Sequence, residues 1–303
     1  MQQIPAGQLP LFGLTFQPTT NNGEISEQDL EDDGVTWRLV GRYALSDDAN
    51  LYASYARGRR PEVLAASGPA QPGTAGRFAA VEAETVDSYE LGAKAALMNR
   101  RLRLDASAYR YDYDNFQTVE QRGTLFVTTN AGKAKAYGVE AQADLAVTSD
   151  FDLLATYAYS HARFETGAYD GNRFRLSPDH SFSLAASYRF PLGDGEFEIR
   201  PSYTWQSKVF FDNSNDRAIF QQPPNAFVAD NVRDEFQKAY GLLNLRLAWT
   251  SNRAPVTVEA FATNLTDEAY IIDAGNTGDN LGLPTFIAGA PRMVGVGVSW
   301  RYR

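Results

Sequence analysis

The chain has 303 residues, 44% of them hydrophobic, 21% charged and 13% aromatic, with no cysteine, two histidines and a formal net charge of −9. The lack of cysteine excludes a disulfide scaffold, a thiolate zinc site, an iron–sulfur cluster and a cysteine nucleophile, and the acidic balance argues against a nucleic-acid-binding surface. No apolar run is long enough for a membrane-spanning helix, whereas a membrane β-barrel stays compatible because its alternating strands look hydrophilic on average.

Residues 1–33 are expected to form a loop-like segment, because they combine prolines with an acidic run. Within residues 9–17, the stretch Leu9–Phe16 predicts at most a partial strand, since Pro10 and Pro18 flank it and proline is confined to strand ends, edges and bulges. The first residues carry neither a basic nor an apolar signal region. The chain is therefore expected either to stay in the cytoplasm or to be a fragment.

Residues 34–303 are predicted to form one domain. From Tyr137 to Val147, apolar residues occupy the odd positions and polar residues most of the even ones, a period of two that predicts a strand with one apolar and one polar face. Helical spacing persists nowhere, so an all-β, antiparallel fold is predicted. Eleven strands are expected at 34–45, 50–57, 86–97, 101–113, 136–147, 151–160, 181–190, 196–205, 240–250, 255–265 and 292–302.

The expected strand at 101–113 changes its pattern midway. Its apolar residues are even-numbered as far as Ala108, but Tyr109, Tyr111 and Tyr113 are odd-numbered. Two interpretations remain open at this point: a bulge reverses the register, or these tyrosines face the interior above the membrane level.

The joins between the expected strands alternate in length. Those after odd-numbered strands have few residues, whereas those after even-numbered strands are long and cover 58–85, 114–135, 161–180, 206–239 and 266–291. This order is typical of a membrane barrel with turns on the periplasmic side and loops outside, and ligand-binding residues are expected on such loops. A soluble β-sandwich is disfavoured, because its loops do not normally sort by length.

The number of strands adds a topological constraint. With long loops outside, the first and the eleventh strand run in the same direction, and two such strands cannot pair antiparallel. The chain is therefore expected to be the C-terminal part of a larger barrel. The second possibility is that residues 9–17 supply a twelfth strand.

Five short motifs follow one another along the chain, and each alone would be weak. The residues that carry them are Tyr55 and Gly58; Glu84, Tyr89, Glu90 and Gly92; Asn130, Gly132, Gly138 and Glu140; Asn264, Leu265, Asp267 and Tyr270; and Pro291 and Arg292. In this order they resemble the C-terminal half of the β-barrel of TonB-dependent receptors, the outer-membrane active transporters of Gram-negative bacteria. The resemblance extends from about Asp33 to Arg303.

The resemblance implies a 22-stranded transmembrane barrel of which eleven or twelve strands are present. It implies energised uptake of a scarce ligand such as a ferric siderophore, cobalamin or a carbohydrate, with no enzymatic activity and no cofactor. The implied partners are outer-membrane lipid, a small ligand such as an iron chelate, the TonB-type energy-transducing complex through a missing N-terminal part, and the barrel-insertion machinery through the last strand. No nucleic acid is expected.

Three departures from the family pattern accompany the resemblance. Family members usually end on an aromatic residue, whereas Tyr302 is followed here by Arg303. A signal sequence, a coupling segment and a plug domain are all missing from this chain. About half of the barrel is missing as well, in agreement with the topological constraint above.

Two polar motifs are candidates for other chemistry, one for calcium binding and one for hydrolysis. Asp212, Ser214 and Asp216 are spaced like the start of a calcium loop, but Arg217 replaces the turn glycine and no acidic residue closes the loop, so a solvated loop is expected. His161 follows Ser160, and His180 follows Asp179. Adjacent residues of a strand point to opposite faces, so a catalytic dyad is not expected.

Aromatic residues are frequent in the long loops. They could contact a ligand or pack the loops against each other, and the sequence leaves both interpretations open for Phe78, Phe126, Phe174, Phe210, Phe211, Phe220, Phe227, Phe236 and Phe286.

The alternative to a receptor is a small closed barrel of twelve strands that acts as an outer-membrane channel or hydrolase.

Overall fold

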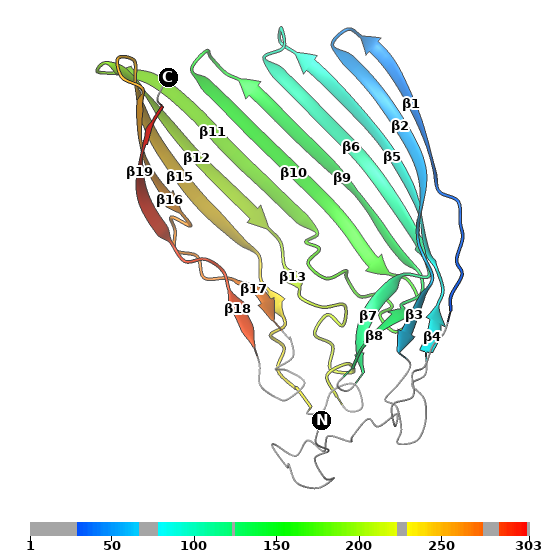
Figure 1. The fold of residues 1–303 in the computed structure, drawn as a ribbon. Coiled ribbons are helices and arrows are strands. Elements are labelled where there is room, and N and C mark those ends of the chain that lie inside the picture. The colour runs from blue at the N-terminus through cyan, green and yellow to red at the C-terminus, as the bar shows by residue number, and fades with distance from the viewer. Residues whose placement is uncertain (1–28, 67–77, 123–124, 223–228, 275–284, 302–303) are drawn as a thin grey trace.

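The computed structural model describes residues 29–66, 78–122, 125–222, 229–274 and 285–301, and these form one curved antiparallel sheet of eleven strands in chain order (Figure 1). No helix that could span a membrane occurs in these residues. The eleven strands are β1 (Trp37–Ser46), β2 (Ala49–Arg60), β5 (Glu84–Leu97), β6 (Leu102–Asp114), β9 (Ala134–Ala146), β10 (Phe151–Phe164), β11 (His180–Leu192), β12 (Gly195–Gln206), β15 (Tyr240–Ser251), β16 (Val256–Thr263) and β19 (Met293–Trp300).

All eleven strands lie where the alternation of the sequence predicts them. The main difference is at the loop end. There β5 begins at Glu84 instead of residue 86 and β10 continues to Phe164 instead of ending at 160, whereas β1, β16 and β19 are shorter than expected. The β-sandwich alternative is wrong, because these strands form a single sheet. The division at residues 33 and 34 stays a prediction.

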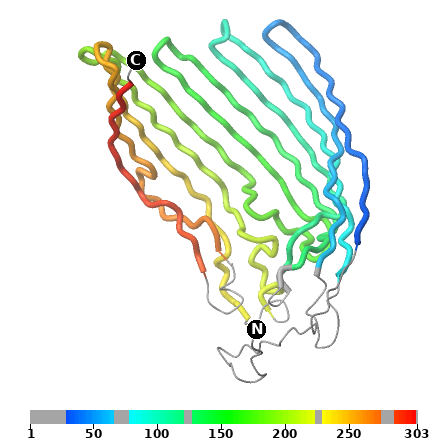
Figure 2. Tube along the Cα trace, in the orientation of Figure 1, coloured from blue at the N-terminus to red at the C-terminus, as the bar shows by residue number. Residues whose placement is uncertain are grey.

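The tight turns gather at one end of the sheet and the long connections at the other (Figures 1 and 2). Four of the long connections contain short hairpins of their own, so the expected loop ranges include strand residues. These hairpins pair β3 (Val63–Ala66) with β4 (Phe78–Val81), β7 (Gln117–Arg122) with β8 (Leu125–Asn130), β13 (Val209–Phe210) with β14 (Phe236–Gln237), and β17 (Ile271–Ala274) with β18 (Phe286–Ala288).

The two faces of the sheet differ in polarity, as the alternation predicts. Two hollows lie on the face that carries Glu140, Gln142 and Asp144, so the polar face is the inside of the curve. The opposite face exposes apolar side chains such as Val139 (43% exposed) and Val296 (83% exposed). A polar lumen and an apolar outer surface are what a membrane barrel requires.

The register of β6 decides how its tyrosines are oriented. Pairing with β5 continues without a shift from Leu97–Leu102 to Thr85–Asp114, and pairing with β9 is equally continuous. The bulge interpretation is therefore wrong. Tyr109 pairs directly with Glu90 of the inner face, so the three tyrosines face the interior.

The sheet ends in two edge strands, β1 and β19, which have a neighbour on one side only in the described part of the chain. Because neighbours are antiparallel throughout, β1 and β19 run in the same direction and cannot close the barrel by pairing with each other. Closure needs an odd number of further strands. The candidate strand at 9–17 lies outside the described residues.

Candidate functional site

The second, third and fourth long connections pack against each other at the loop end of the sheet. We call residues 113–122, 125–134, 164–179 and 207–222, which include the adjoining strand ends, the loop block. Its apolar centre is Phe164, which is 1% exposed, together with Tyr169, Ala131 and Ala134. Four half-buried aromatic side chains surround this centre: Tyr113, Phe116, Phe174 and Phe220.

The loop aromatics divide into packed and exposed residues. Phe174 and Phe220 belong to the loop block, and Phe211 is 3% exposed. The Lys208 ammonium lies 4.2 Å and 3.6 Å from the ring centroids of Phe210 and Phe236. Phe78 and Phe286 are exposed. Phe227 and the side chain of Phe126 lie outside the part of the chain that the structure describes. Phe174 and Phe220 therefore pack between connections, whereas Phe210 and Phe236 pack within the fourth one.

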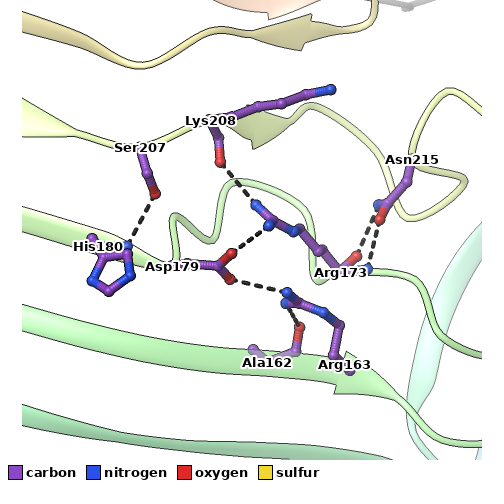
Figure 3. A network of polar contacts seen from close by, with 8 residues as sticks. All are labelled: Ala162, Arg163, Arg173, Asp179, His180, Ser207, Lys208 and Asn215. Atoms are coloured by element: carbon purple, nitrogen blue, oxygen red, sulfur yellow. Dashed lines mark hydrogen bonds and ion pairs between the residues drawn. The ribbon is translucent and has the colours of Figure 1, made fainter.

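A polar network supports the loop block (Figure 3). The carboxylate of Asp179 forms ion pairs with two guanidinium groups, those of Arg163, at 3.0 Å, and Arg173. Arg173 also donates to the carbonyl of Lys208 at 3.3 Å, and its backbone exchanges two hydrogen bonds with the amide of Asn215, at 2.6 Å and 2.9 Å. The third connection is thus fixed to β10 on one side and to the fourth connection on the other.

The segment at 212–216 is part of this packing, so the expectation of a solvated loop is wrong. Asp212 accepts hydrogen bonds from the Ser214 hydroxyl at 2.6 Å and the Asn215 backbone at 2.9 Å, as in an Asx turn. Asn172 donates to the carbonyls of residues 213 and 214. No group of side chains suited to a metal ion occurs among the described residues.

The two histidines make aromatic and hydroxyl contacts. The Nδ1 atom of His180 lies 2.9 Å from the Tyr157 hydroxyl, and His161 stacks on Tyr137 with 4.8 Å between ring centroids. The carboxylate of Asp179 points to the two arginines and the His180 ring points elsewhere (Figure 3). Asp179 and His180 therefore do not form the dyad that a hydrolase needs.

Replacing Asp179 by alanine is expected to loosen the third connection. Arg163 and Arg173 are only 18% and 26% exposed, and hydrogen bonds between charged groups contribute about 1.5–3 kcal/mol. A loss of about 2 kcal/mol would raise the open population of this loop about thirtyfold. Tryptic cleavage after Arg173 and Arg175 on intact cells measures this, with the exposed Asp170→Ala as the control. Equal cleavage of the two variants would contradict the expectation.

Asp216 gives the loop block a pH dependence. The residue is 3% exposed and its Oδ2 atom has no hydrogen-bond partner among the described residues, and burial, with Asp234 and Asp212 nearby, raises the pKa of its carboxyl above 3.8. An acid whose pKa is raised in the folded state binds protons more tightly when folded, so stability falls as pH rises from 3.8 through the raised pKa.

Asp216→Asn removes the charge that burial disfavours. We expect cleavage of the fourth connection by proteinase K, normalised to an unfolded peptide at each pH, to be faster at pH 7 than at pH 4 in the natural protein. The asparagine variant should lose this slope and be more resistant than the natural protein at pH 7. A slope that persists in the variant would assign it to another group.

The motif residues of β2 and β5 make structural contacts. The Tyr55 hydroxyl donates to Asp87 at 2.9 Å, and its ring stacks on Tyr89 at 5.1 Å. Glu84 accepts from the Gln117 backbone at 2.7 Å. Glu90 accepts from the Tyr52 hydroxyl at 2.6 Å. The remaining two, Gly58 and Gly92, allow the close approach of Val86 and of the Tyr52 ring.

The motif at Asn130–Glu140 joins two connections and reaches the lumen. Asn130 accepts from the Gly132 backbone at 2.7 Å, and the φ angle of Gly132 is +87°, a conformation that favours glycine. Gly138 lies against Tyr109 and the Tyr159 carbonyl, and Glu140 lines a hollow of the inner face.

The last two motifs form one clasp at the loop end of β16 and β19. Asn264 is 3% exposed and makes three side-chain hydrogen bonds, two with Glu268 and one with the carbonyl of Ala290. Leu265 donates from its backbone to Leu243 at 2.7 Å. Asp267 accepts from the Arg292 backbone, next to Pro291, at 3.1 Å. The Tyr270 ring stacks on Tyr240 at 4.7 Å.

The motif residues thus make structural contacts in the wall, and two of them, Glu90 and Glu140, line a hollow of the inner face. Sequence reasoning missed Asp179, Arg163 and Arg173, as well as the asparagines that join the connections. These contacts link residues up to 95 positions apart, and no local pattern marks them.

The chain matches the family described as TonB dependent receptor-like, beta-barrel, over residues 12–265. It belongs to this family. A solved TonB-dependent receptor, the ferric yersiniabactin uptake receptor FyuA from Yersinia pestis, superposes with a TM-score of 0.68 at 20% identity, covering 86% of this chain and 36% of that one. This likeness shows the shared barrel fold.

Curated relatives are receptors and transporters. The chain is 27% identical over 194 residues to the catecholate siderophore receptor Fiu of Escherichia coli strain UTI89, covering 61% of this chain and 24% of Fiu. It is 25% identical over 267 residues to the ferrichrome outer membrane transporter/phage receptor of Escherichia coli K12, covering 86% of this chain and 32% of that protein. The chain thus spans about a quarter to a third of the length of these relatives.

Proposed function

We propose that this chain forms part of the wall and five outer loops of an outer-membrane receptor that takes up a ferric siderophore in a Gram-negative bacterium. The observation that carries the proposal is the family match over most of the chain, together with relatives whose names specify siderophore receptors or a ferrichrome transporter. The sorting of turns and loops to opposite ends of the sheet supports it, because outer loops of such a barrel face the ligand.

The chain alone would not transport. Its sheet has two unpaired edges among the described strands, and in the proposal a further part of the receptor closes the barrel, blocks it at rest and couples it to the TonB complex. Energy then comes from the inner membrane, and the ligand is a ferric siderophore. The channel or hydrolase alternative gains no support from His180 and Asp179, whose side chains bind other partners.

Uptake of radioactive iron by iron-starved cells tests the proposal. Cells that carry the natural gene product are compared with a deletion strain, each with and without a protonophore, using ferric siderophores from the medium of the same organism. We expect gene-dependent uptake that the protonophore abolishes. Gene-dependent uptake that survives the protonophore would indicate a passive channel, and gene-independent uptake of every siderophore would refute the proposal.

A further inference from the structure

The inner face carries a row of three tyrosines along one strand. Tyr109, Tyr111 and Tyr113 of β6 point into the lumen and are half-buried. The rings of Tyr109 and Tyr111 stack with centroids 5.1 Å apart, and those of Tyr111 and Tyr113 meet edge to face at 6.4 Å. The row runs along the direction of transport, from the middle of the wall to the loop block, where Tyr113 meets Phe116 and Phe174.

The neighbouring strand lets these rings lie against the wall. On β9, the residues paired directly with Tyr113, Tyr111 and Tyr109 are Ala134, Ala136 and Gly138. Ala134 and Ala136 are only 2% and 7% exposed, and a Cβ atom at Gly138 would lie 2.8 Å from the Tyr109 hydroxyl. Tyr113 packs against the buried cluster that contains Ala134, and the hydroxyl end of Tyr109 lies over Gly138. All three phenols stay partly exposed on the face that lines the lumen.

We infer that Tyr109 and Tyr111 form a stacking track for the aromatic ring of an iron chelate on its way from the loops into the lumen. The inference rests on the proposed function and names the chemistry of its substrate. Stacking gives an aromatic ring an interaction beyond simple burial. Since adjacent rings lie 5.1 Å apart along the strand, a ligand ring can pass from one phenol to the next without losing apolar contact.

Charge narrows the ligand class further. Glu90 and Glu140 lie on the inner face beside the turn-side end of the row, where Glu90 pairs with Tyr109 and Glu140 with Ser107. Carboxylates in a concave wall repel a multiply charged anion. The track therefore suits a phenol-bearing chelate of low net charge better than a trianionic complex.

The test separates a track from a structural role. Cells that produce the natural gene product are compared with the double variant Tyr109→Leu/Tyr111→Leu and with Tyr109→Phe/Tyr111→Phe, which keeps both rings. Tyr188→Leu, on the outer face, is the matched control. The probes are the ferric complex of a 2-hydroxyphenyl-thiazoline carboxylate chelator and a ferric trihydroxamate without aromatic rings. Binding to de-energised cells and energised uptake are both measured.

The leucine variant should take up the aromatic chelate about tenfold more slowly, since each ring contact contributes about three- to tenfold. The leucine variant should still take up the trihydroxamate and bind the aromatic chelate at the loops as the natural protein does. The phenylalanine variant and the Tyr188 variant should match the natural protein in both binding and uptake. Equal loss for both probes would assign the tyrosines a structural role. Unchanged aromatic uptake, or transport of the trihydroxamate alone, would overturn the track while leaving the receptor function intact. Energised uptake of neither chelate would overturn the track, whereas the receptor function is refuted only if uptake of the organism's own ferric siderophores is also independent of the gene.

Discussion

Replacing Gly138 by alanine is expected to destabilise the barrel by about 4 kcal/mol. A Cβ atom at this position would overlap the carbonyl oxygen of Tyr159 and lie within 2.9 Å of the Tyr109 ring. The carbonyl belongs to β10, which pairs with β9 along thirteen consecutive residue pairs. It cannot move aside without breaking that ladder, so the substitution forces a choice between steric overlap and lost strand pairing.

Two other glycines of the same sheet provide a graded comparison. Gly41 has no atom within 4 Å of the Cβ position, and a Cβ at Gly92 would overlap only the ring end of Tyr52, which can rotate away. We expect Gly41→Ala to change the free energy of unfolding by less than about 0.5 kcal/mol and Gly92→Ala to lower it by about 1–2 kcal/mol. Urea unfolding in phospholipid vesicles measures all three. A Gly138 variant as stable as the Gly41 variant would refute the steric argument.

The strands were predictable because each must satisfy two solvents at once. A membrane strand exposes one face to lipid and the other to a polar lumen. Apolar and polar residues must therefore alternate along it, as Val139 and Glu140 do. The number of strands and the direction of the two edge strands follow from the same alternation. None of this depends on contacts between distant parts of the chain.

Tyrosine marks the limit of that reasoning. Tyr109 and Tyr111 have an apolar ring and a polar hydroxyl, so either face of the sheet could accept them, and their parity alone left a bulge possible. Only the uninterrupted register between β5, β6 and β9 places them inside. The small residues opposite them on β9 are a signal in the sequence, but the strand pairing has to be known before it can be recognised.

The loop block was not predictable for a different reason. The run from Asp212 to Asp216 contains the side chains of an Asx turn, and its polarity is that of a solvated loop. It is half-buried, and Asp216 is fully buried, because Asn172 and Arg173, about forty residues earlier, satisfy polar groups of this run. A pairing of that kind has no period and no local composition, so only the folded arrangement of β10 and β12 brings it about.

Asn264→Ala is expected to lower the free energy of unfolding by about 3 kcal/mol and to release the last strand at its loop end. The amide of Asn264 donates to the carbonyls of Glu268, at 2.9 Å, and Ala290, at 3.1 Å, and accepts from the Glu268 backbone at 2.8 Å. Alanine leaves these buried groups without partners, at about 1 kcal/mol each. The φ angle of +48° adds to the cost, because alanine tolerates it less well than asparagine.

The consequence reaches β19 because the same clasp holds Asp267, which receives the Arg292 backbone at 3.1 Å just before that strand begins. Asn264→Asp keeps the acceptor but turns a carboxylate oxygen toward the carbonyls of Glu268 and Ala290, so at pH 7 it should be no more stable than Asn264→Ala. Asn252→Ala, in an exposed tight turn, is the matched control. Urea unfolding gives the stability, and protease sensitivity near residue 290 reports release of the strand. If Asn264→Ala is as stable and as protected as Asn252→Ala, this asparagine is not what secures the last strand, and the edge at β19 must be held by its pairing with β16 alone.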